Sequence, residues 1–258
     1  MTQDRLRSTL REGRVAYGLG HFSGAPSLVE AAAYAGFDFV YLDMHQAPLG
    51  LETVSHLVRA ADASGISPII RVSENNPTEL NRALNLGPAG VMVPHVETVE
   101  DAKRVVHAAK YHPVGDRQAC PSVRAARYSD TPWPTFTRQA NAETLVCVLL
   151  ESAPAIERAR DIAAVDGVDV LLVGVHDLST SLGLAGENFR HSRLFEHLQR
   201  VVAASAEHGK VVWTTTVTTM EENYVDLLER AGVRMISFYT DEGIFLRACQ
   251  RLLKTKTL

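Results

Sequence analysis

Eight short apolar runs recur along the chain, and longer segments of helical period separate them. The runs lie at 15–20, 39–43, 68–72, 90–95, 145–151, 170–174, 211–216 and 235–240. Continuous apolar runs are typical of parallel strands that are covered on both faces. Many of the intervening segments end in glycine, as in "AGFDF", "SGISP" and "AGVRM", which favours the close of a helix. Eight such units in 258 residues predict an α/β protein with a (β/α)₈ barrel.

A doubly wound open sheet is the alternative fold for this pattern. Its nucleotide-binding versions need a glycine-rich turn after an early strand. The stretch "GLGHFSG" (18–24) has glycines at offsets 0, 2 and 6, which do not match G-x-G-x-x-G. The pattern therefore favours one barrel domain over 1–258. It carries an insert at about 112–141, a shorter loop at 184–191 and a C-terminal helix at about 243–255.

The composition excludes several classes of protein. A net charge of −4 gives no reason to expect nucleic acid or an anionic membrane as partner. The N-terminal stretch is charged where a signal peptide needs an apolar centre, and no apolar run approaches membrane-spanning length. The three cysteines (Cys120, Cys147 and Cys249) show no metal-ligand spacing, and Cys147 lies in an apolar run where an inert thiol is expected. We expect a reduced, cytoplasmic protein.

Polar side chains gather where the predicted strands end. The ends carry Asp43, His45, Arg71, His95, Glu151 and Asp177. Each alone has a structural interpretation; Asp177 in "GVHDLS", for example, could cap a helix. In a barrel, however, the carboxyl ends of the strands build the active site. Charges gathered at one rim need partners or a ligand, so the pattern indicates a functional site.

Glu151 and Asp177 are the candidate metal ligands. They end adjacent strands, so their carboxylates could share one cation. Two carboxylates with open water positions suit a hard ion such as Mg²⁺ or Mn²⁺ better than a closed zinc site. Arg71 then offers a guanidinium fork to a substrate carboxylate or a developing oxyanion. A cation and an arginine that face one small acid make an enolate-stabilising site.

These residues resemble those of a known family. The matching pieces run from about 13 to 250: "AGFDFVYLDMHQAPL", "PIIRV", "ALNLGPAGVMVPHVETVEDAKRVV", "YHPVGDR", "SVRAARY", "LLES" and "GVDVLLVGVHDLSTSLG". They are similar to the class II, metal-dependent 2-oxo-acid (pyruvate) aldolases of the HpcH/HpaI aldolase family, which are related to citrate lyase β subunits. The resemblance implies a barrel of the phosphoenolpyruvate/pyruvate-binding type. It also implies a homo-oligomer, a hexamer or trimer of dimers, in which the last helix packs on a neighbouring subunit.

The resemblance also implies roles for residues. Glu151 and Asp177 match the metal ligands, with Mg²⁺, Mn²⁺ or Co²⁺ as the cation. Arg71 matches the transition-state arginine, and the backbone N–H groups of His176 and Asp177 match those that hold the pyruvyl carboxylate. Such enzymes act as carbon–carbon lyases: they form a metal-stabilised enolate of a 2-oxo acid and make or break a bond to an aldehyde.

The chain departs from the family pattern at the acid–base residues. The family motif reads Asp-x-Glu-His, whereas the chain has Asp43, Met44, His45 and Gln46, so an amide replaces the basic histidine. The aspartate that raises that histidine's basicity falls on Asn85. A glutamine that contacts the substrate falls on Leu149. An amide cannot accept a proton at neutral pH, so the base of this chain is altered or absent.

Two hypotheses follow from these departures. In the first, the chain is a divergent aldolase in which His45 or a metal-bound hydroxide is the base, with His95 and His176 as further candidates for the base. Aldol cleavage, aldol addition and decarboxylation all need the same enolate, so this hypothesis leaves the three reactions open. In the second, the barrel binds a 2-oxo acid as a regulatory or otherwise non-catalytic protein. We favour the first because the two carboxylates and Arg71 are retained together.

Three further features have two interpretations each. Arg124 and Arg127 in the insert could reach a substrate tail or lie in a subunit interface. The "TTTVTT" run (214–219) could hydrogen-bond a hydroxylated substrate, although β-propensity explains most of it. Asp241 and Glu242 follow the last run, where capping of the next helix suffices to explain them.

Overall fold

The computed structural model describes residues 5–216 and 223–255. Eight parallel strands form a closed barrel in the order β1 to β8. The strands are β1 (Ala16–His21), β2 (Phe39–Asp43), β3 (Ser67–Arg71), β4 (Gly90–Val93), β5 (Leu145–Leu150), β6 (Val170–Val173), β7 (Val211–Thr215) and β8 (Met235–Thr240). The predicted (β/α)₈ fold is therefore confirmed.

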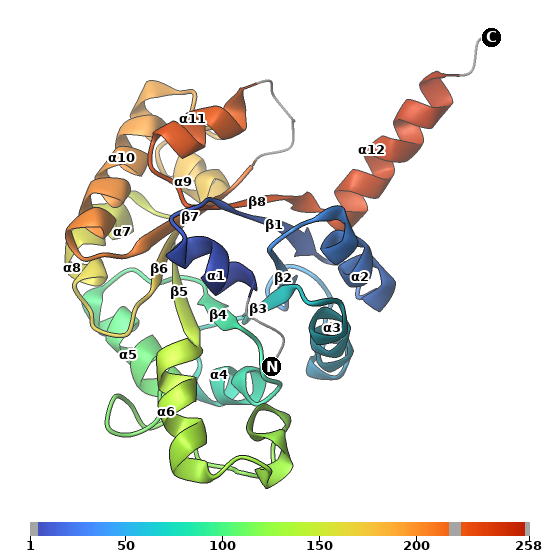
Figure 1. Ribbon diagram of the computed structural model, residues 1–258. Helices are drawn as coiled ribbons and strands as arrows, with labels where there is room; N and C mark the ends of the chain where they lie inside the picture. The colour runs from blue at the N-terminus through green and yellow to red at the C-terminus, as the bar shows by residue number, and fades with distance from the viewer. Residues whose placement is uncertain (1–4, 217–222, 256–258) are drawn as a thin grey trace.

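Helices follow every strand, and all of them except the last, α12, cover the outside of the barrel (Figure 1). They are α2 (Pro26–Ala35), α3 (Leu51–Ser64), α4 (Pro77–Leu84), α5 (Val99–Ala109), α7 (Ala153–Glu157), α8 (Ala159–Ala163), α9 (Val175–Ser181), α10 (Ser192–Glu207), α11 (Tyr224–Arg230) and α12 (Asp241–Lys254). Apolar side chains from the helices α2 to α11 of this list and from the outward strand positions form one continuous buried layer. Burial of that layer is the main stabilising contribution to the fold.

The insert between β4 and β5 is more ordered than its sequence suggests. It contains a 3₁₀ turn, η1 (Arg124–Ser129), and a three-turn helix, α6 (Trp133–Glu143). Phe136 and Ala126 form a small separate apolar cluster with Tyr111. Pro132 and Pro134 flank the first helical residue, Trp133, where proline is tolerated. Because prolines usually argue against a helix, the sequence did not indicate α6.

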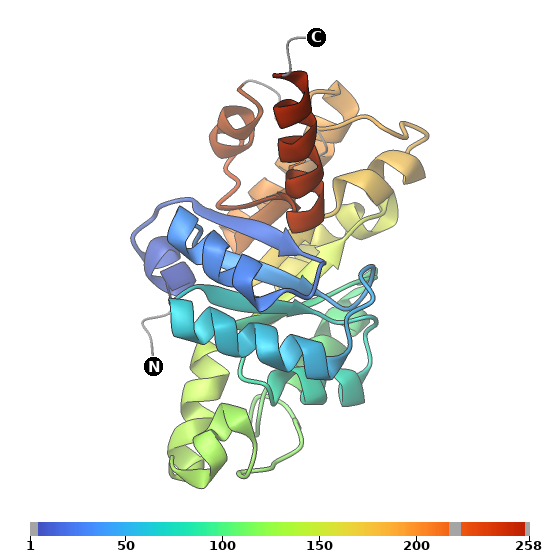
Figure 2. The ribbon, with the colours of Figure 1, turned by 90° about the vertical axis from the view of Figure 1, so that its right-hand side faces the viewer.

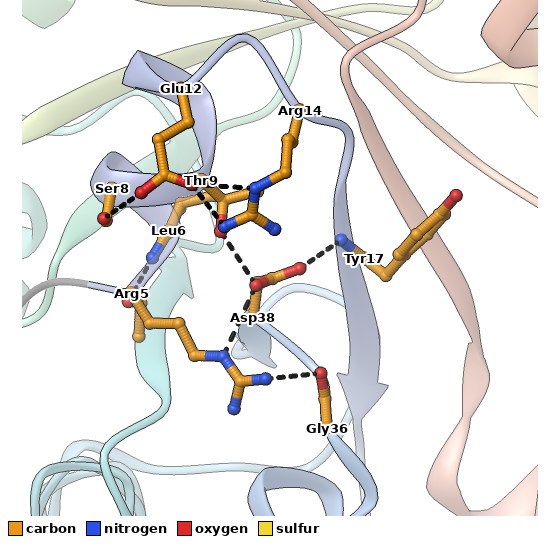
Figure 3. Close-up of polar contacts among 10 residues, drawn as sticks. Arg5, Leu6, Ser8, Thr9, Glu12, Arg14, Tyr17, Gly36 and Asp38 are labelled. Carbon is orange, nitrogen blue, oxygen red and sulfur yellow. Dashed lines mark hydrogen bonds and ion pairs between the residues drawn. The ribbon is translucent and has the colours of Figure 1, made fainter.

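Helix α1 (Arg5–Arg11) closes the end of the barrel at which the strands begin. Leu6 is fully buried in the interior cluster of the barrel, and its N–H donates to Ser67 Oγ at 3.1 Å. Asp38, just before β2, accepts from Thr9 Oγ1 at 3.0 Å and from the Tyr17 N–H at 2.9 Å (Figure 3). Because this end is plugged and tied to the sheet, access to the interior is left to the opposite end.

Two glycines of β1 make room for aromatic side chains inside the barrel. Gly18 pairs with Phe39 and Gly20 pairs with Tyr41 in the register of β1 and β2. A Cβ at Gly18 would lie 2.3 Å from the Phe39 ring, and one at Gly20 would lie 2.6 Å from Tyr41 Oη. Both aromatic rings also meet Trp213 edge to face, with centroids 5.1 and 5.8 Å apart. The interior is therefore a packed core rather than a pore.

Helix α12 runs away from the barrel in both views (Figures 1 and 2). Large apolar side chains are exposed along it: Ile244, Phe245, Leu246, Leu252 and Leu253. The helix begins two residues before its expected start. Within the described residues, no helix is long and apolar enough to cross a membrane.

Candidate active site

The carboxyl ends of the strands surround a cavity of about 230 Å³. Its polar lining includes Arg71, Glu151, His176 and Asp177, together with the hydroxyl residues Thr215, Thr216 and Thr240. Its apolar lining includes Phe22, Met92, Leu149 and Leu172. The cavity is large enough for a small organic acid, and it lies where barrel enzymes place their chemistry.

Asp43 organises the β2 side of the rim. The residue is fully buried, and its Oδ1 accepts from the backbone N–H groups of His45 at 2.8 Å and Gln46 at 2.7 Å. Its Oδ2 lies 3.1 Å from Arg71 Nη1, and Asp43 and Arg71 are direct partners in the β2–β3 register. One carboxylate thus sets both the path of the loop after β2 and the position of the guanidinium.

Glu151 is the buried carboxylate of the site, with 7% of its surface exposed. Burial raises the pKa of its carboxyl, Arg71 and His95 lower that pKa, and the negative charge of Asp177 raises it. Glu151 Oε1 lies 3.1 Å from His95 Nδ1 and accepts weakly from the His95 N–H at 3.3 Å. Gly174 leaves the space beside Oε2 open, since a Cβ there would lie 3.3 Å from that oxygen.

His45 and His95 meet at the rim. His45 Nδ1 lies 2.8 Å from the Ser73 carbonyl oxygen, so in the neutral ring Nδ1 carries the proton and Nε2 is the free acceptor. The two imidazole rings meet edge to face with centroids 5.3 Å apart. His95 has a left-handed backbone (φ 55°), which is uncommon for a residue with a side chain. His45 thus contacts His95, which in turn lies beside Glu151, and neither histidine is among the residues that line the cavity.

Other residues predicted from the sequence lie elsewhere. Gln46 is exposed, and no side-chain hydrogen bond from it is found in the described part of the chain. Asn85 closes α4 at the start of β4, at the opposite end of the barrel, and its Oδ1 accepts from Arg117 at 3.0 Å. Within one chain, therefore, the positions of the family's histidine–aspartate pair are not brought together.

The two insert arginines do not line this cavity. Arg124 pairs with Asp62 and donates to the Leu86 carbonyl at 2.7 Å, near the beginnings of the strands. Arg127 lies in the same region, around a second hollow beneath the insert. The idea that these arginines reach a substrate tail in their own chain is therefore wrong. Of the "TTTVTT" run, residues 217–219 lie outside the described residues, whereas Thr215 and Thr216 line the cavity.

Asp241 does more than cap the last helix, which Thr240 caps through its own hydroxyl. The Asp241 carboxylate accepts from the Phe22 N–H at 2.9 Å and from the Ser23 hydroxyl. It also lies 3.0 Å from the ring of fully buried His21. These contacts fix the end of β1, and hence Phe22, against the cavity. The sequence carried no signal for them because the partners are about 220 residues apart.

Comparison with known proteins places the chain in one family. The model of the HpcH/HpaI aldolase/citrate lyase family matches residues 19–246. The chain is 42% identical to the 2-dehydro-3,6-dideoxy-6-sulfogluconate aldolase of Pseudomonas putida over 64% of each chain. It is 32% identical to the 4-hydroxy-2-oxovalerate aldolase of Novosphingobium aromaticivorans, over 94% of this chain and 90% of the relative. A crystal structure of an HpcH/HpaI aldolase/citrate lyase family protein from Burkholderia cenocepacia has a TM-score of 0.88 at 32% identity and 98% coverage of both chains.

Proposed function

Because the chain belongs to the HpcH/HpaI aldolase/citrate lyase family, we propose that it is a metal-dependent carbon–carbon lyase that cleaves or forms an aldol bond of a 2-oxo acid. The family and its named relatives indicate aldolase or lyase activity on 2-oxo acids. The observation that carries the finer proposal is the gathering of Glu151, Asp177 and Arg71 around one small cavity. The reaction passes through an enolate of the pyruvate type.

Glu151 and Asp177 are the residues that would hold a divalent cation. Burial and the negative charge of Asp177 both destabilise the charged form of Glu151. A cation between the two carboxylates would offset the desolvation and the repulsion between the negative charges. Within the described residues, no group of three or more His, Cys, Asp or Glu side chains is arranged to hold a metal ion, so the protein would supply only two ligands. Two carboxylates with open positions fit Mg²⁺, Mn²⁺ or Co²⁺, which accept water as further ligands. When bound, the cation supplies Lewis-acid stabilisation of charge on the substrate.

Arg71 stabilises the oxyanion that develops at C2 of the 2-oxo acid. The Asp43 carboxylate holds the guanidinium in place, and Arg71 lines the cavity. A donor fixed in place before the reaction stabilises developing charge without reorganising. The N–H groups of His176 and Asp177, in the first turn of α9, have no intrahelical acceptor and are available to the substrate carboxylate.

His45 acts as the general base. In the cleavage direction its Nε2 removes the proton of the C4 hydroxyl, the C3–C4 bond breaks, and the aldehyde leaves. The electron pair of that bond forms the enolate, which regains a proton at C3 from the same imidazole. Support comes from the Ser73 carbonyl, which leaves Nε2 as the acceptor, and from the position of His45 beside His95. Exposed Gln46 has no atom that can accept this proton.

Turnover of a 4-hydroxy-2-oxo acid tests the proposal. Pyruvate release is followed in a coupled assay with Mg²⁺, Mn²⁺ or Co²⁺, with chelator, and with Glu151→Ala. We expect release that the chelator and Glu151→Ala abolish. Glu97→Gln, in the loop after β4 and not among the residues that line the cavity, should retain it. Tight metal-dependent binding of 2-oxo acids without cleavage would instead favour the alternative, a regulatory binding barrel. Loss of CO₂ from oxaloacetate without aldol cleavage would favour a decarboxylase.

A further inference from the structure

The floor of the cavity is apolar except for one hydroxyl. The floor consists of side chains that line the cavity and also belong to the interior cluster of the barrel, namely Tyr41, Met92, Leu149 and Leu172. Thioether and aliphatic groups offer no hydrogen bond of normal strength. Any polar atom of a ligand that reaches this depth therefore has only the Tyr41 hydroxyl as a partner on the floor.

Tyr41 is buried, and its hydroxyl is unsatisfied within the protein. Only 7% of the residue is exposed. Within residues 5–216 and 223–255, no group donates to or accepts from Tyr41 Oη. Because Tyr41 lines the cavity, a hydroxyl without a protein partner is available there to an oxygen atom of a ligand.

The surrounding side chains hold the phenol ring in one orientation. Phe22 meets the ring nearly edge to face at 6.2 Å, and Trp213 does so at 5.8 Å. The hydroxyl lies over Gly20, where a Cβ would come within 2.6 Å of the oxygen. The absence of a side chain at Gly20 therefore creates the space that the hydroxyl occupies, so the donor is positioned before a ligand arrives.

The hydroxyl can act only as a donor to a charged acid. Burial raises the pKa of the Tyr41 phenol, and the negative charge of Asp43 raises it further, so the proton stays on the oxygen at every physiological pH. A carboxylate or enolate oxygen is a stronger acceptor than a neutral one.

We propose that Tyr41 is a substrate-binding residue whose hydroxyl donates a hydrogen bond to an oxygen of the pyruvyl part of the 2-oxo acid. The inference rests on the proposed function for the identity of the ligand. Because the pyruvyl part is common to short and long 2-oxo acids, the contribution of Tyr41 is the same for pyruvate and for a 4-hydroxy-2-oxo acid.

Equilibrium binding of pyruvate in the presence of Mg²⁺ tests this assignment, measured by calorimetry on wild type and Tyr41→Phe. The variant loses one oxygen atom and keeps the ring. Tyr111→Phe is the control, because it removes the hydroxyl of a buried tyrosine that packs against Trp133 and does not line the cavity. We expect the Kd for pyruvate to rise about 10- to 100-fold in Tyr41→Phe, as for the loss of a hydrogen bond to a charged group, and to stay within about twofold in Tyr111→Phe.

A second measurement separates binding from folding and from metal loading. The Mn²⁺ affinity and the unfolding midpoint of Tyr41→Phe should match those of wild type, and KM for the 4-hydroxy-2-oxo acid should rise by the same factor as the Kd for pyruvate. An unchanged Kd in a folded Tyr41→Phe overturns the inference, even if the enzyme turns over. Pyruvate binding without turnover in wild type overturns the proposed function alone, and absence of any pyruvate binding overturns both.

Discussion

Asp43 and Arg71 are direct partners across β2 and β3, joined by an ion pair of 3.1 Å. The same carboxylate accepts from the N–H groups of His45 and Gln46. A single buried group therefore couples the proposed oxyanion donor to the loop that carries the proposed base. Loss of this group should disturb both at once.

Asp43→Asn tests this coupling. The variant leaves Arg71 without its counter-charge, and breaking a buried pair costs about 3 kcal/mol of unfolding free energy. We expect that loss in urea titrations together with a fall of about 100-fold in kcat/KM. Asp62→Asn removes the partner of Arg124 in a more exposed pair at the other end of the barrel and should cost less than about 1 kcal/mol. Equal losses of stability and activity in the two variants would contradict the claim that Asp43 couples Arg71 to the loop after β2.

Gly174→Ala tests the space beside the Glu151 carboxylate. The backbone of Gly174 is extended (φ −82°), so alanine is conformationally allowed there. Its Cβ, however, would lie 3.0 Å from Glu151 Cβ and 3.1 Å from Leu149 Cδ1. We expect a stability loss of about 1–3 kcal/mol from overpacking and a displaced carboxylate. Titration with Mn²⁺ should show weaker binding than in wild type, and unchanged Mn²⁺ affinity would place the metal away from Glu151.

The exposed apolar side chains of α12 predict self-association. Phe245 is 69% exposed and Leu252 70% exposed, on a helix that projects from the barrel (Figure 2). Exposed apolar groups on this scale mark interaction surfaces. The double variant Phe245→Glu/Leu252→Glu should shift a hexamer or trimer of dimers toward smaller species in analytical ultracentrifugation. Val114→Glu, on the insert, should not. A wild-type monomer at micromolar concentration would contradict the prediction.

Acid should destabilise the protein through His21. Burial lowers the pKa of this imidazole below its ordinary value of 6.5, although the nearby Asp241 carboxylate raises it. The unfolded chain then binds a proton that the folded chain does not, so stability falls as the pH drops below about 6.5. The decrease in unfolding free energy from pH 7.5 to 5 should be smaller in His21→Gln than in wild type. His56→Gln, at an exposed histidine of α3, should leave that decrease unchanged.

The strands were predictable, because each is an apolar run whose length matches a buried strand. The runs at 39–43 and 235–240 coincide with β2 and β8, and the others differ from their strands by one or two residues at an end. Because the carboxyl ends of the strands form one rim of a barrel, the sequence also predicted that Arg71, Glu151 and Asp177 lie at the same rim. Helix α6 escaped prediction because its prolines and polar residues weaken the helical pattern.

Side-chain contacts within the site were less predictable. The contacts of His95 with Glu151 and His45 join three strand ends, and no spacing in the sequence encodes them. Tyr41 reads as one more apolar residue of a strand. That Tyr41 lines the cavity, with its hydroxyl close to Gly20, is visible only in the structure.

The exchange of the methyl protons of pyruvate tests the central claim most directly. The protein is incubated with pyruvate and Mg²⁺ or Mn²⁺ in D₂O, and the methyl signal is followed by NMR in wild type, His45→Ala and Gln46→His. The account predicts metal-dependent exchange in wild type that falls by about 10²–10⁴ in His45→Ala, since that is the usual contribution of a positioned base. No exchange in wild type, with exchange appearing in Gln46→His, would contradict it and show that His45 does not act as the base.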